Sequence, residues 1–269
     1  MTGLINGLTT TAMVLRLMPF QITSYGLSDT GLVRKNNEDV WGSLPQHHLY
    51  LLADGMGGHQ AGEVAARETS LFLLTFLRQA FEKEKIELMS PDEVSDLMRL
   101  AFVEANHFVY QLSQSHDLLR GMGTTLVCVY FHEDICVVGH VGDSRVYRCR
   151  DGKLEQLTCD HSLIKQLSDS GKKSAWQTED MNGKNIITKA IGTEPFVEPT
   201  IEITKVKEHD LYLLCSDGLS DLVSSDEINN VLKACLTVEE KVRSLISSAK
   251  RKGGHDNITA VCIDVKQLS

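Results

Sequence analysis

Two hydrophobic patterns alternate along the chain, and together they predict its elements. Apolar runs of strand length end at turns rich in Gly, Asp, Asn or His. Short turns such as His132-Glu133-Asp134 and Asp151-Gly152 join neighbouring runs, which favours antiparallel pairing because parallel strands need a long crossover. The predicted strands cover residues 20–28, 40–44, 49–52, 124–131, 135–141, 144–150, 154–157, 201–206, 211–215 and 257–265.

Apolar residues at helical spacing predict longer elements between these groups of strands. Ser90-Pro91-Asp92-Glu93 has the composition of a helix start, with a capping Ser, Pro at the first position and Glu at the third. The predicted helices cover residues 61–85, 91–112, 225–234 and 238–250, with a short one at 162–170 before a polar flap at 171–183.

This order of elements predicts an α+β fold. Strands cluster early, in the middle and late, and two helices follow each outer group. We therefore expect a central β-sandwich of two mainly antiparallel sheets flanked by helices, in α-β-β-α layers. Without an internal repeat or linker, residues 20–269 are expected to form one domain. Residues 1–19 contain one basic residue, Arg16, and resemble no signal peptide, so we expect a flexible N-terminal extension.

Composition narrows the class of protein. The net charge of −9 argues against nucleic-acid binding, which usually needs a basic surface. No apolar run approaches the roughly 18 residues of a membrane span. The seven cysteines are odd in number and form no CxxC pair, which indicates a reducing compartment without disulfides or structural zinc. We expect a cytoplasmic monomer.

The stretch from His48 to His59 is the most informative part of the sequence. An apolar run at Leu49–Leu52 stops at Asp54, and glycines follow at positions 55, 57 and 58. Glycine lets a backbone approach a bound group closely, although an ordinary tight turn with Asp as a turn former explains the same residues. The turn alone is the weaker explanation, because similar acidic strand ends recur at Asp217 and Asp256.

Convergence of these strand ends would gather further carboxylates. Asp143 lies in the turn between two predicted strands, and Glu38 and Asp39 precede another. Carboxylates packed at short range raise each other's pKa unless cations neutralise them, and oxygen ligands select Mg²⁺ or Mn²⁺ over zinc. Two such ions about 3.5–4 Å apart can drive an in-line displacement at phosphorus. Arg34 is the fitting partner for a phosphate, because its planar fork binds oxygens in pairs.

The sequence lacks the motifs of other enzymes that act on phosphates and of zinc hydrolases. No cysteine has an arginine six positions later, as a thiolate-based phosphatase would need. Gly55-Met56-Gly57-Gly58 is not followed by Lys-Ser or Lys-Thr, which excludes a P-loop at this turn. The chain also lacks the HExxH pattern of zinc hydrolases.

Six short motifs together resemble the metal-dependent protein phosphatases, the protein phosphatase 2C (PPM) family, and most closely its bacterial-type branch. Each motif is weak alone, but their order and spacing from about Gln21 to Val265 are highly specific. The motifs are Arg34-x-x-Asn37-Glu38-Asp39, Ala53-Asp54-Gly55-Met56-Gly57-Gly58-His59, Gly123-Thr124-Thr125, Gly142-Asp143-Ser144-Arg145, Ser216-Asp217-Gly218 and Asp256-Asn257.

The resemblance implies hydrolysis of phosphoserine and phosphothreonine in proteins by a PPM-type catalytic domain with Mn²⁺ or Mg²⁺, two ions per site. It implies that Asp54 bridges both metals, that the Gly55 carbonyl binds one, and that Asp217 and Asp256 bind the other. Asp143 would hold a third, weaker ion. The remaining implied roles are Glu38 and Asp39 acting on water at the metals, Arg34 binding the substrate phosphate, and Asn257 orienting the site.

One departure from the family concerns the proton donor to the leaving group. Animal-type members carry a histidine directly after Asp-Gly, where this chain has Met56. Water or another histidine would then donate the proton to the leaving group, and His59 is a candidate. We expect a structural role for His161. Two other functions stay open: a phosphoprotein-binding module without turnover, and a phosphatase for small metabolites. The family resemblance implies phosphorylated proteins as partners, within a Ser/Thr kinase system.

Overall fold

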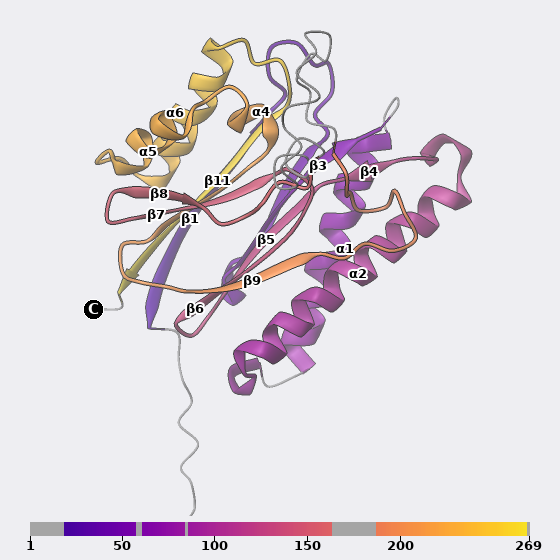
Figure 1. Ribbon diagram of the computed structural model, residues 1–269, viewed down its shortest axis with the longest axis horizontal. Coiled ribbons are helices and arrows are strands. Elements are labelled where there is room, and N and C mark those ends of the chain that lie inside the picture. Colours follow the sequence, from indigo (N-terminus) through magenta and orange to yellow (C-terminus); the bar gives the residue numbers. More distant parts are fainter. Residues whose placement is uncertain (1–18, 58–60, 84–85, 163–186, 268–269) are drawn as a thin grey trace, which may run out of the picture.

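A computed structural model (Figure 1) describes residues 19–57, 61–83, 86–162 and 187–267 of the chain. Two sheets stack face to face between helices, as the sequence predicts, and every pair of described strands is antiparallel. The first sheet has the order β1 (Phe20–Asp29), β11 (Ile258–Gln267), β10 (Leu211–Cys215), β7 (Arg145–Arg150) and β8 (Lys153–Gln156). The second has β2 (Asp39–Leu44), β3 (Leu49–Met56), β5 (Leu126–His132), β6 (Ile135–Val141) and β9 (Thr200–Lys205), with β4 (Gly123–Thr124) paired to β3.

The central strands are apolar without a break because both of their faces are buried. Along β3, Leu49 and Leu51 pack under the helices of the second sheet, whereas Tyr50 and Leu52 point into the core between the sheets. Adjacent residues of a strand face opposite sides, so a strand between a helical layer and another sheet needs apolar residues at every position. The same alternation occurs in β10.

Helices cover the outer face of each sheet (Figure 1). The capping box predicted at Ser90 forms: its hydroxyl accepts a hydrogen bond from the Glu93 N–H, and the Glu93 carboxylate accepts one from the Ser90 N–H. None of the described helices combines the length and hydropathy needed to cross a bilayer. Helices α1 (Ala61–Lys83) and α2 (Pro91–Ser115) cover the second sheet, and α5 (Ser225–Lys233) and α6 (Val238–Arg251) cover the first.

The structure differs from the predicted elements at three places around the acidic motifs. Strand β3 does not stop before Asp54 but continues through it to Met56. The single strand predicted at residues 124–131 is interrupted at Thr125, which separates β4 from β5 and turns its N–H to the Asp54 carbonyl, 2.8 Å away. The strand predicted at residues 211–215 is confirmed as β10, but Asp217, which follows it, begins a one-turn helix, α4 (Asp217–Ser220), that was not predicted. Apolar periodicity cannot predict so short a helix.

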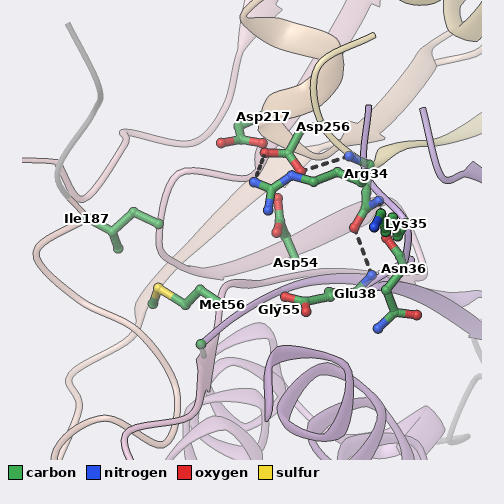
Figure 2. A pocket seen from close by; sticks show the side chains of 12 residues that line it. Arg34, Lys35, Asn36, Glu38, Asp54, Gly55, Met56, Ile187, Asp217 and Asp256 are labelled. Carbon is green, nitrogen blue, oxygen red and sulfur yellow. Dashed lines mark hydrogen bonds and ion pairs between the residues drawn. The ribbon is translucent and has the colours of Figure 1, made fainter. Parts of the chain in front are cut away.

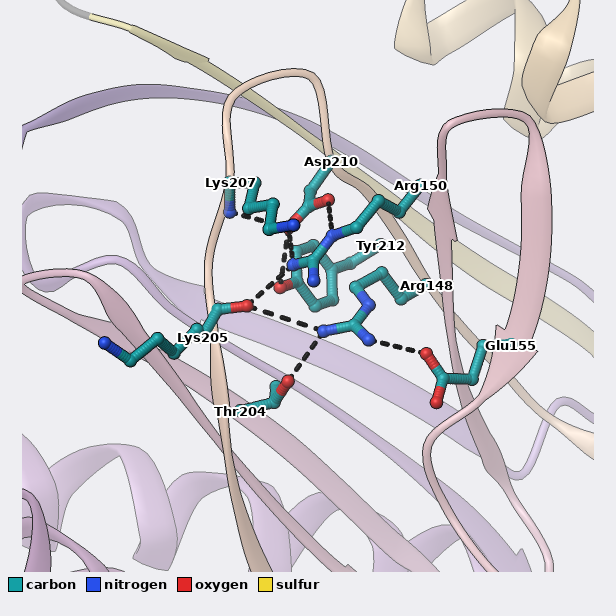
Figure 3. Close-up of polar contacts among 8 residues, drawn as sticks. All are labelled: Arg148, Arg150, Glu155, Thr204, Lys205, Lys207, Asp210 and Tyr212. Atoms are coloured by element: carbon teal, nitrogen blue, oxygen red, sulfur yellow. Dashed lines mark hydrogen bonds and ion pairs between the residues drawn. The ribbon is translucent and has the colours of Figure 1, made fainter.

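An ion-pair network joins the two sheets (Figure 3). It lies around the C-terminal half of β7, whereas Asp143 precedes the N-terminal end of that strand. Arg148 and Arg150 project from β7 in the first sheet and donate hydrogen bonds to Thr204 Oγ1 and the Lys205 carbonyl on β9 in the second. Arg150 also forms a bidentate pair with the fully buried Asp210, at 2.6 and 2.7 Å. The network therefore ties the two sheets together by charge-assisted bonds.

Some predictions fall on residues that the structure does not describe. They are the extension at 1–19 (except Pro19), most of the helix at 162–170, the flap at 171–183, and His59. The division into an extension and one catalytic domain stays a prediction.

Candidate active site

A cavity of about 380 Å³ opens where loops and strand ends of both sheets meet (Figure 2). Asp54, Asp217 and Asp256, which are far apart in sequence, all line it. Arg34, Glu38, Gly55 and Asn257 line it as well. We call it the carboxylate cavity. The fold thus brings together these three acids, as the sequence predicted, whereas Asp39 and Asp143 do not line the cavity.

Asp39 lies behind this cavity and joins the two sheets. It stands opposite Asp54 in the β2–β3 ladder, so both carboxylates occupy neighbouring positions at the strand ends. Asp39 Oδ2 accepts hydrogen bonds from Ser216 Oγ at 2.8 Å and Thr259 Oγ1 at 2.7 Å, both in the first sheet. Its Oδ1 is buried and lacks a hydrogen-bond donor among the described residues.

The turns that carry Asp217 and Asp256 are pressed together. A Cβ on Gly218 would lie 2.0 Å from the Asn257 carbonyl oxygen, closer than any side chain allows. Glycine after Asp217 is therefore needed for the close approach of two backbones, and the Ser-Asp-Gly motif carries that signal in the sequence.

Asn257 holds the loop that carries Arg34 and Glu38. Its Nδ2 donates to the carbonyls of Thr30 and Asn36 at 3.1 and 2.8 Å, and its Oδ1 accepts from the Glu38 N–H at 2.8 Å. The side chain is 5% exposed and uses both of its polar ends. Asn257 thus fixes the loop against the turn of Asp256.

Asp143 does not line the carboxylate cavity but lies buried beside it. Thr125 connects the two carboxylate positions: its Oγ1 accepts from the Asp54 N–H at 3.1 Å and lies 2.7 Å from Ser144 Oγ. Arg145 anchors the same turn through a bidentate pair with Asp160. Asp143 Oδ1 is buried and without a hydrogen-bond partner in the described part of the chain.

Burial and mutual repulsion raise the pKa values of the gathered carboxylates. Burial, and then repulsion by Asp143 and Asp256, raises the pKa of Asp217 to about 7. Burial likewise raises the pKa of Asp39 and of Asp143 to about 6. The pKa of Asp54 is raised well above its ordinary value by burial, followed by repulsion from Asp39, Asp217, Asp143 and Asp256. Such a cluster takes up positive charge, either as protons or as cations.

Arg34 supplies part of that charge. Its Nη2 lies 2.7 Å from Asp256 Oδ2, and both side chains are partly exposed (Figure 2). Among the described residues, no three His, Cys, Asp or Glu side chains already stand in the geometry of a metal site. The donor set nevertheless fits divalent cations: it is made of oxygen atoms, it is acidic, and Asp39 and Asp143 each present a buried unpaired oxygen.

The sequence profile described as "Protein phosphatase 2C" matches residues 29–252. The chain belongs to the protein phosphatase 2C family.

Curated relatives within the protein phosphatase 2C family agree. The serine/threonine phosphatase stp of Listeria monocytogenes is 35% identical over 240 residues, covering 88% of this chain and 93% of that protein. Protein phosphatase PhpP of Streptococcus pneumoniae is 32% identical, covering 90% and 96%. The protein is thus a protein serine/threonine phosphatase.

Solved structures of phosphatases show the same fold. The serine/threonine phosphatase PstP/Ppp of Mycobacterium tuberculosis superposes with a TM-score of 0.79 at 35% identity, covering 91% of this chain and 99% of that one. A PstP catalytic domain in complex with two manganese ions superposes with a TM-score of 0.75. Dependence on two metal ions is general for protein phosphatase 2C enzymes, and the acidic cavity of this member matches it.

The structure does not test the proton donor that the sequence suggested, His59. His59 lies outside the described residues, while Met56, which replaces the animal-type histidine, lines the cavity. His161 has a structural position, as expected: its Nδ1 accepts from the Gly142 N–H, and its Nε2 lies 3.1 Å from Thr200 Oγ1. Burial lowers the pKa of His161 to about 4, so the ring is neutral near pH 7.

The supporting hydroxyls are the part of the phosphatase site that sequence reasoning missed. Thr125, Ser144 and Ser216 stood inside recognised motifs, yet no role was predicted for them. Thr259 lay in none, because it follows Asp256-Asn257 within an ordinary strand. Only the tertiary contacts reveal that all four hold acidic turns in place.

Proposed function

We propose that Asp54, Asp217 and Asp256, with the Gly55 carbonyl, hold two divalent cations and that phosphoserine and phosphothreonine in proteins are hydrolysed there. The supporting observation is that partly buried carboxylates from both sheets meet around one cavity, where burial and mutual repulsion raise the pKa values of Asp54 and Asp217. Mn²⁺ and Mg²⁺ both suit the oxygen donors, and a third, weaker ion is proposed at Asp143.

The residues around these ligands position the reactants. Two hydroxyls hold the Asp39 carboxylate, and Asn257 holds the backbone N–H of Glu38. Both acids are proposed to orient water. Arg34 donates one hydrogen bond to Asp256 and is proposed to exchange it for the substrate phosphate, since a guanidinium binds the oxygens of carboxylates and phosphates alike.

Two cations held there would lower the pKa of a water molecule that they bind. They would also stabilise the attacking and leaving oxygens of the reaction. We propose either His59 or water as the proton donor to the leaving group. We further propose a cytoplasmic monomer that reverses phosphorylation by Ser/Thr protein kinases, on the strength of the family and the sequence alone.

The test is hydrolysis of phosphothreonine and phosphoserine peptides with and without Mn²⁺. Asp54→Asn and Asp217→Asn should each lower kcat at least about 1,000-fold, because each removes a metal-binding charge. Asp134→Asn is the control, since it removes one carboxylate from the exposed β5–β6 turn, far from the cavity. Full activity in excess chelator would overturn the proposal.

The two other functions left open by the sequence give different results in the same assay. A binding module would retain phosphopeptides without releasing phosphate. A metabolite phosphatase would hydrolyse sugar phosphates with a higher kcat/KM than any phosphopeptide.

A further inference from the structure

A second cavity of about 380 Å³ adjoins the carboxylate cavity. The two share Arg34, Asp217 and Asp256, so one boundary wall separates them. Beyond that wall the second cavity is lined by Gly218, Asp221, Leu222 and His255. We call it the side cavity. A chain whose phosphorylated residue occupies the carboxylate cavity would place a flanking side chain beside it.

The acidic side chains that line the side cavity differ in whether they have a partner of opposite charge. Asp256 is paired with Arg34, and the proposed function assigns Asp217 and Asp256 to cations. Asp221 differs: its N–H donates to the Asp217 carbonyl at 2.8 Å, which fixes its backbone at the end of α4. Its carboxylate forms no hydrogen bond or ion pair with the described residues.

Cationic side chains near Asp221 are committed elsewhere. Arg145 is close enough for its charge to act on Asp221, but its guanidinium binds Asp160 through three hydrogen bonds of 2.7–3.1 Å. Arg34 is directed to Asp256. Asp221 is therefore the acid of this cavity that has room for an incoming cation.

We propose that the side cavity is a specificity subsite that accepts a Lys or Arg side chain next to the phosphorylated Ser or Thr of the substrate. The inference rests on the proposed function. The walls fit such a side chain: Leu222 and the His255 ring flank the methylene stem, and Asp221 receives the charged head. Long basic side chains commonly bury their stem and leave the head at a polar group.

The experiment uses the full chain and one phosphothreonine peptide whose flanking residue is Lys, norleucine or Glu, on either side. Norleucine keeps the length of lysine and removes its charge. We expect kcat/KM to fall from Lys to norleucine to Glu on at least one side, with about a tenfold span at low salt. The span should shrink in about 0.5 M NaCl, because a partly exposed ion pair is screened.

Three variants separate the subsite from general attraction of cations by an acidic protein. Asp221→Asn should bring the Lys-to-Glu ratio close to one, and Asp221→Lys should invert it. Asp134→Asn, with the same change of net charge, should keep the ratio of the unaltered protein. The Lys-to-Glu ratio of kcat/KM is taken within each variant, so differences between variants in folded fraction or metal occupancy cancel.

The outcomes also distinguish this inference from the proposed function. Equal kcat/KM for all three peptides, with normal Mn²⁺-dependent turnover, overturns the subsite and leaves the phosphatase assignment standing. A preference that survives Asp221→Asn overturns it as well. Absence of turnover on every phosphopeptide would remove the proposed function, and the subsite with it.

Discussion

Asp39 and Asp54 stand directly opposite each other on β2 and β3; Asp39 is buried, and Asp54 is partly buried at the edge of the carboxylate cavity. Asp39 is the less movable of the two, because hydroxyls of Ser216 and Thr259 hold one of its oxygens. Two facing carboxylates in such a place cannot both carry full charge at low cost. The repulsion between these carboxylates destabilises the fold until bound cations or protons neutralise part of their charge.

We predict that the stability of the metal-free protein falls as the pH rises. The pKa values of Asp39 and Asp143 are raised to about 6, and that of Asp217 to about 7, above the ordinary value of 3.8. Between about pH 4 and pH 7 the folded chain thus holds more protons than the unfolded chain, so raising the pH favours unfolding. Chemical denaturation in EDTA should show at least about 2 kcal/mol less stability at pH 7.5 than at pH 5.

Saturating Mn²⁺ at pH 7.5 should restore the lost stability, because a ligand that binds only the folded state shifts the equilibrium towards it. Asp217→Asn should flatten the pH dependence in EDTA, whereas Asp134→Asn should leave it unchanged. A metal-free protein that grows more stable from pH 5 to pH 7.5 would contradict the prediction.

A second prediction concerns Thr125, which links the Asp54 strand to the Asp143 turn. Thr125→Val keeps the shape of the side chain but leaves the buried Asp54 N–H and Ser144 hydroxyl without this partner. The free energy of unfolding should fall by about 1–3 kcal/mol, the usual cost of an unsatisfied buried polar group. We also expect kcat to fall about tenfold, because small displacements of catalytic groups are costly.

Thr125→Ser is the matched control, since it retains the hydroxyl and loses only a methyl group. It should recover most of kcat and the Mn²⁺ concentration needed for half-maximal activity. Equal effects of Val and Ser would show that packing, and not the hydrogen bonds, explains the role of Thr125.

The acids of the site could be predicted from the sequence, but the bonds that position them could not. Asp54 and Asp217 follow apolar strands and precede glycine, a pattern visible without any structure. Thr125 and Thr259 look like ordinary strand residues, because hydroxyl partners far along the chain leave no local signal. The pairing of Arg34 with Asp256 was missed for a similar reason: sequence assigned Arg34 to the substrate alone.

A third prediction tests the ion-pair network at the far end of the sandwich (Figure 3). Asp210 is fully buried and accepts hydrogen bonds from Arg150, the Lys207 N–H and Tyr212. Asp210→Asn leaves the Arg150 guanidinium without its counter-charge, so we expect a loss of about 3 kcal/mol in urea denaturation. The kcat of the folded fraction should not change, because the network lies away from both cavities.

The control for Asp210 is Asp134→Asn, which breaks an exposed contact with Lys205 at 3.6 Å. Exposed pairs contribute little, so its effect should stay below about 0.5 kcal/mol. A similar loss of stability for the two variants would show that burial of Asp210 carries no special weight.

The last prediction concerns Gly218, where the turns of Asp217 and Asp256 touch. A Cβ at this position would lie 2.0 Å from the Asn257 carbonyl oxygen, and backbone cannot yield as a flexible side chain does. Gly218→Ala must therefore separate the two turns, which we expect to lower stability by about 2 kcal/mol and to weaken Mn²⁺ activation at least about tenfold. Ser220→Ala, in the same helix, is the control: its buried hydroxyl has no hydrogen-bond partner among the described residues, so its removal should change stability by less than about 0.5 kcal/mol. Unchanged Mn²⁺ activation in Gly218→Ala would mean that the spacing of these two acids is not what the metal site requires.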